Sequence, residues 1–137
     1  MKVIDLTMIS MLLRKKLVRA GIVELVDLAV LHKQPQRCFE LSHETGVPLK
    51  RIHWMVSVAL FHEIKGVGLN HSALLVKIGI DSIEKLAKSN PEELLIAMAE
   101  SNIASPVIQL LPSLLAVELW VKDAKVLAES EPKNLMA

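Results

Sequence analysis

The residues best suited to chemistry lie near the middle of the chain, in the segment Ile64-Lys65-Gly66-Val67-Gly68. Two glycines around an apolar residue let the backbone turn sharply, while the apolar side chain anchors the turn in a core. If a helix follows directly, the amides of its first turn stay unpaired beside the positive end of the helix dipole. Such amides form an anion site that suits a phosphodiester.

Side chains around this turn could bind the same anion. Lys65 lies within the turn, and a polar run from Asn70 to Ser72 follows it. Cations, amides, imidazoles and hydroxyls can all contact phosphate oxygens. We therefore expect a nucleic-acid-binding site made of Lys65, Gly66, Val67, Gly68, Asn70, His71 and Ser72. A tight interhelix turn with a purely structural role would use the same glycines, so that alternative stays open.

The elements that must position this site are predicted to be helices. No stretch alternates with period two, which argues against a sheet. Glycines, prolines and capping residues place the helices near 6–19, 23–32, 35–45, 48–62, 69–78, 82–88, 91–101 and 112–129.

Particular residues should start and end these helices. Gly21 and Gly79 are expected to end helices with positive φ, and Gly46 and Asn102 to form left-handed corners. Asp81 or Ser82 should cap one helix, and Asn90 should cap the next with Pro91 in its first turn.

The chain contains an internal repeat. Residues Leu17–Ala29 match Leu75–Ala87 in the order Leu-Val-basic-x-Gly-Ile, then an apolar residue, then Leu-Ala. In the first copy Met8-Ile9-Ser10 stands where the second has Gly66-Val67-Gly68. We therefore predict an all-α fold of two diverged helix-hairpin-helix repeats packed into one compact globule. Residues 1–60 form the degenerate repeat, 61–128 the repeat with the Gly-Val-Gly hairpin, and 129–137 a C-terminal tail.

Ordered motifs in residues 61–128 resemble a domain-of-unknown-function family built on tandem helix-hairpin-helix units. The motifs are Gly66-Val67-Gly68, Ile78–Ser82, Leu86-Ala87, Asn90–Glu92, Leu111–Ser113 and Trp120–Lys125. Residues 20–60 resemble the preceding half of the family, although Met55 stands where a Trp is expected. The resemblance implies an all-α fold and no established activity.

Charge and composition narrow the function classes. Residues 1–77 carry a net charge of +5 and residues 78–137 a net charge of −4, which suggests a basic side that faces an anion. The histidines His53, His62 and His71 are nine residues apart, which is not the spacing of helical metal ligands. We expect no metal, no cofactor and no catalytic residues. Trp54 and Trp120 are expected in the core.

The remaining features bear on location and partners. The longest nearly apolar stretch, Val107–Val121, is too short to cross a bilayer, so no membrane association is expected. The single cysteine, Cys38, suits a reducing cytoplasm. Residues 44–52 resemble the turn of a DNA-reading helix-turn-helix, with Lys50 and Arg51 opening the second helix. The matching segment Ser101–Ala104 lacks those charges, so the same corner is also explained by the repeat architecture alone.

Two classes of function stay open. The first is a non-catalytic module that binds the DNA or RNA backbone without sequence preference. The second is a protein-interaction or scaffolding domain that binds itself or another protein. A mean hydropathy of +0.41 favours this class, because apolar surface can be shared with a partner.

Overall fold

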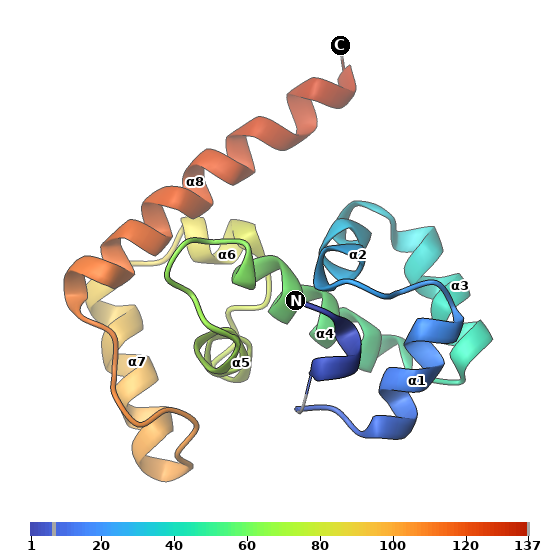
Figure 1. The fold of residues 1–137 in the computed structure, drawn as a ribbon. Coiled ribbons are helices and arrows are strands. Elements are labelled where there is room, and N and C mark those ends of the chain that lie inside the picture. Colours follow the sequence, from blue (N-terminus) through green and yellow to red (C-terminus); the bar gives the residue numbers. More distant parts are fainter. Residues whose placement is uncertain (7, 137) are drawn as a thin grey trace. The chain divides into compact units, whose positions relative to one another are not determined.

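The computed structural model describes the backbone of residues 1–6 and 8–136, with side chains to Glu129 (Figure 1). These residues are all-α: they contain helices and turns, one isolated β-bridge between Lys2 and Glu24, and no β-strand. The chain divides into two compact units, Met1–Leu60 and Phe61–Ala137.

The described residues of the first unit form two 3₁₀ turns and four helices, the last of which crosses the boundary between the units. The elements are η1 (Val3–Asp5), α1 (Met11–Arg19), α2 (Leu25–Ala29), η2 (Val30–Lys33), α3 (Pro35–Thr45) and α4 (Leu49–His62). The first helix begins later than expected because the Ser10 side chain caps it by accepting a hydrogen bond from Leu13 N at 3.2 Å. Fully buried side chains, led by Leu17, Leu28 and Leu41, form the core.

In the second unit, the part of the chain that the structure describes forms four further helices, α5 (Leu69–Lys77), α6 (Ile83–Ala87), α7 (Pro91–Ala104) and α8 (Leu114–Met136). Helix α8 packs against α6 and α7. The predicted tail, 129–137, continues α8 as far as Met136, while its side chains after Glu129 lie outside the described residues. Leu74, Leu86, Met98 and Val117 are buried in this unit.

The predicted glycine corners are confirmed in both units. Gly21 has φ +92° and Gly79 has φ +96°. In each case the next isoleucine donates to the carbonyl five residues earlier, Ile22 to Leu17 and Ile80 to Leu75, both at 2.9 Å. This pattern is the Schellman motif, which needs a left-handed residue after the helix. Gly46 also has positive φ, at +72°.

The capping predictions have mixed outcomes. Ser82 and Asn90 cap α6 and α7 as expected, by accepting from Lys85 N and Glu93 N. The left-handed corner at Asn102 is wrong, because no described residue other than glycine has positive φ. Asn102 lies inside α7 and acts through its side chain. Its Oδ1 accepts from Val107 N and Ile108 N at 2.7 and 3.0 Å, and its Nδ2 donates to Ile108 O.

Candidate nucleic-acid interface

The Gly66–Gly68 hairpin joins α4 to α5. Gly66 has φ +87°, a conformation that side chains with a Cβ rarely adopt. Ile64 and Val67 are 2% and 3% exposed, and Val67 N donates to Ile64 O at 3.1 Å. The two apolar side chains therefore anchor the turn in the core, while Gly66 is exposed.

The first turn of α5 is left open. Its N-cap residue is Gly68, which has no side chain to accept a hydrogen bond. Ser72 N donates to Gly68 O at 2.9 Å, but the amides of Leu69, Asn70 and His71 have no partner among the described residues. Free amides at a helix start are the donors that bind anions.

Several other helices are closed at the same position. In four of them a capping side chain accepts a hydrogen bond from the backbone N–H of the third helical residue. The capping residues are Ser10 for α1, Ser82 for α6, Asn90 for α7 and Ser113 for α8. Helix α3 also lacks a side-chain cap, but Pro35 removes one amide hydrogen from its first turn, so α3 offers fewer free donors than α5. Ser10 is the counterpart of Gly68 in the sequence repeat, so the two copies differ in this feature.

The side chains of the expected site differ in their accessibility. Lys65 and Asn70 are exposed, whereas His71 is half-buried and its Nε2 is buried without a hydrogen-bond partner among the described residues. Ser72 is fully buried, and its hydroxyl donates to Gly68 O at 3.0 Å. The expectation that Ser72 contacts a phosphate directly is therefore corrected: its hydroxyl helps to hold the hairpin backbone.

Trp120 of α8 supports the hairpin, which the sequence did not indicate. Its ring centroid lies 5.5 Å from that of His71 at a tilt of 57°. A Cβ added to Gly66 would lie 3.5 Å from Trp120 Nε1. Trp120 is 2% exposed, which confirms its predicted place in the core. The other tryptophan, Trp54, is instead half-buried, with the Arg51 guanidinium 4.3 Å above its ring.

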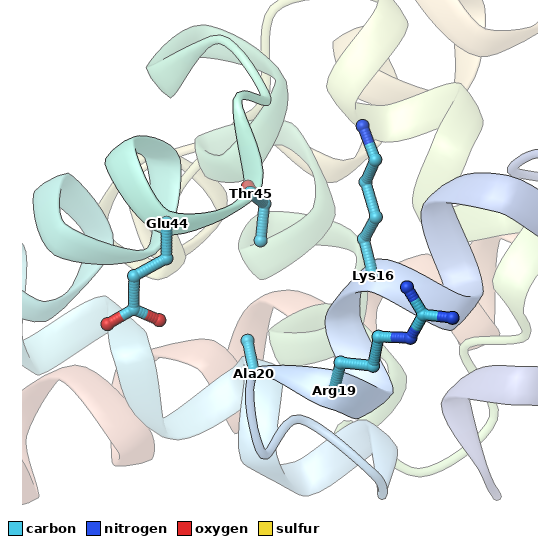
Figure 2. Close-up of a pocket in the computed structure, with 5 residues that line it drawn as sticks. All are labelled: Lys16, Arg19, Ala20, Glu44 and Thr45. Carbon is cyan, nitrogen blue, oxygen red and sulfur yellow. The ribbon is translucent and has the colours of Figure 1, made fainter.

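The basic residues of α1 lie in the first unit. Lys15, Lys16 and Arg19 are exposed. Arg14 is half-buried and has a structural role, because its Nη1 donates a hydrogen bond to Ile4 O at 2.7 Å. Lys16 and Arg19 line an open hollow of about 360 Å³ with Ala20, Glu44 and Thr45 (Figure 2). In Figure 2 the cationic ends of Lys16 and Arg19 extend away from the Glu44 carboxylate, which pairs with Arg37 at 2.9 Å.

Groups suited to metal or thiol chemistry are sparse. Among the described residues, no three His, Cys, Asp or Glu side chains are close enough together to hold a metal ion. Cys38 is buried and its thiol donates to Leu31 O at 3.4 Å. Burial raises the pKa of this thiol above its ordinary value, which lowers its reactivity. Within the described part of the chain, none of the helices has the length and apolar character needed to span a bilayer.

Comparison with known proteins places the chain in a family. No curated protein and no solved structure matches it. The family described as "Domain of unknown function (DUF4332)" matches residues 8–136, nearly the whole chain. The chain therefore belongs to the DUF4332 family.

Proposed function

We propose that this protein is a non-catalytic module that binds the phosphate backbone of a nucleic acid through the Gly66–Gly68 hairpin, without reading base sequence. The observation that carries the proposal is the open first turn of α5. Three amides are free there, and the N-cap residue has no side chain to occupy them. The helix dipole adds a partial positive charge at the same point.

The surrounding side chains support an anionic ligand. Lys65 supplies a cation on the hairpin, and Asn70 supplies an exposed amide group. The remaining contacts come from the main chain, which touches phosphates and carries no information on base identity. This composition favours binding to DNA or RNA of any sequence.

We infer that the two units are diverged copies of one helix-hairpin-helix unit, because both have a Schellman corner at the same place in the repeat. Ile9 and Val67 are also both 3% exposed at matching positions. Only the second copy leaves the following helix open. The reducing cytoplasm is the proposed location, where the Cys38 thiol stays reduced.

Fluorescence anisotropy tests the proposal with labelled duplex DNA, single-stranded DNA and RNA of several sequences. We expect similar affinity for all sequences and strong weakening by salt. Contact with roughly three phosphates gives a log–log salt slope near about −3 on duplex DNA. No binding at roughly 50 mM salt and tens of micromolar protein would refute the proposal, because non-specific binders reach that range.

A pair of lysine variants shows whether binding uses the hairpin. Lys65→Ala should lower affinity for all sequences alike and flatten the salt slope by about one. The control, Lys88→Ala, removes the same charge from an exposed lysine at the end of α6. Equal effects of the two variants would indicate that binding follows net charge rather than the hairpin.

A further inference from the structure

Helix α8 carries apolar side chains on two opposite faces. Its inner face, with Val117, Trp120, Val121 and Ala124, is buried in the unit that α8 shares with α6 and α7. Its outer face carries Leu115, Leu119 and Val126, which are 66%, 49% and 60% exposed. We call these three residues the outer stripe. A surface helix is usually polar on its solvent side, and a helix that is apolar all round is usually covered.

The outer stripe has the spacing of a helix–helix seam. Leu115, Leu119 and Val126, with Lys122 between them, follow the 4-3-4 spacing that places side chains on one face and forms coiled-coil contacts. Exposed charges accompany this seam. Glu118 lies toward its N-terminal end, and Lys122 and Lys125 lie toward its C-terminal end.

We propose that the outer stripe is the contact between two copies of this chain, paired through antiparallel α8 helices. The arrangement of charges selects this partner and this direction. In an antiparallel pair, Glu118 of each copy lies beside Lys122 and Lys125 of the other, and Leu115 packs against Val126. A parallel pair would instead bring Glu118 of each copy close to Asp123 of the other and place Lys122 beside Lys122, and like charges at a seam repel.

The outer stripe does not include the hairpin residues, so this proposal is independent of nucleic-acid binding. Its first test is the mass in solution by size exclusion with light scattering. At concentrations up to about 200 µM, which reveal the weak association of a small interface, we expect twice the chain mass of 15.2 kDa. A monomer throughout that range overturns the proposal.

Variants locate the interface. Leu119→Lys places a further cation in the seam beside Lys122 and should shift the protein to monomer. The control, Ile96→Lys, makes the same change on α7, at an isoleucine that is 58% exposed, and should leave the dimer intact. Circular dichroism checks that both variants fold. A dimer that survives Leu119→Lys, or that Ile96→Lys disrupts equally, overturns the proposal.

Disulfide crosslinking tests the direction of the helices, in a Cys38→Ala background. A mixture of Leu115→Cys and Val126→Cys chains should form a crosslinked dimer under mild oxidation. Neither variant should crosslink to itself, because an antiparallel pair separates each position from its own copy by eleven residues, about 16 Å along the axis. If either variant alone forms a crosslinked dimer and the mixture forms no dimer that contains both variants, the antiparallel arrangement is overturned.

Discussion

Replacing Gly68 with serine would occupy one of the three free amides of the proposed anion site while preserving the fold. Gly68 has φ −80° and ψ 171°, which any residue can adopt. A Cβ there would lie 3.7 Å from His71 Nδ1, an ordinary contact distance. The new hydroxyl can accept from His71 N, as the Ser10 side chain accepts from Leu13 N in α1. The first turn of α5 would then have the cap that the first copy already has.

The expected effects on folding and binding have opposite signs. A serine cap adds a few tenths of a kcal/mol relative to glycine. The loss of glycine's freedom in the unfolded chain adds about 0.4–1 kcal/mol. Unfolding should therefore require about 1 kcal/mol more. Binding loses one amide-to-phosphate hydrogen bond, roughly 1.5–3 kcal/mol for a charged acceptor, so affinity should fall about ten- to a hundredfold.

Urea unfolding and fluorescence anisotropy on the same Gly68→Ser preparation measure the two effects. We expect raised stability together with weakened binding, a combination that general damage to the fold cannot produce. Unchanged affinity in a stabilised variant would refute the assignment of the phosphate to the α5 amides. A clear loss of stability would refute the description of Gly68 as an open N-cap.

Three further predictions concern the fold and the single thiol. Gly79→Ala should cost about 1 kcal/mol or more in urea unfolding, because alanine is strained at φ +96°, and an unchanged midpoint would contradict the Schellman corner. Asn102→Ala removes three hydrogen bonds to Val107 and Ile108 and should cost about 1–3 kcal/mol, whereas Asn70→Ala, at an exposed residue with no such bonds, should cost little. The Cys38 thiol should react slowly with a disulfide reagent at neutral pH and quickly in denaturant, since burial raises its pKa, and fast labelling of the native protein would contradict its burial. The free energy of unfolding should fall as the pH rises through the ordinary pKa range of a thiol, because the thiol then ionises more readily in the unfolded chain.

Local signals in the sequence predicted much of the fold. Proline and asparagine at the start of α7 and glycine at the end of α1 and α5 act on their immediate backbone, so their effects are visible without tertiary information. The start of α1 was misplaced because apolar residues continue N-terminal to the helix. Ile9 is buried just before the Ser10 cap, in a segment that looks helical by composition alone.

Other errors arose where a side chain had more than one possible role. Asn102 is a residue type that tolerates left-handed backbone, but here its amide group organises the loop that follows α7. Ser72 is polar and close to the hairpin, yet its hydroxyl bonds to the carbonyl four residues earlier, a common alternative for serine in helices. That alternative could have been weighed from the spacing of Gly68 and Ser72.

The support that Trp120 gives to the hairpin required the tertiary structure. Trp120 is far from Gly66 in sequence, and no local pattern pairs them. Its position near His71 and Gly66 depends on how α8 packs in the second unit. The outer stripe of α8 was similarly hidden, because the sequence shows abundant apolar residues without showing which of them stay exposed.

Amide chemical-shift mapping by NMR identifies directly which backbone N–H groups of the hairpin and of α5 contact DNA. The ¹⁵N-labelled protein is titrated with a short duplex DNA at low salt, and each backbone N–H is followed separately. We expect the largest shifts on Leu69, Asn70 and His71, with smaller shifts at Gly66 and Gly68, and we expect added salt to reverse them. Shifts confined to other surfaces, such as the α1 residues Lys15, Lys16 and Arg19, or no shifts at all, would contradict phosphate binding at the hairpin.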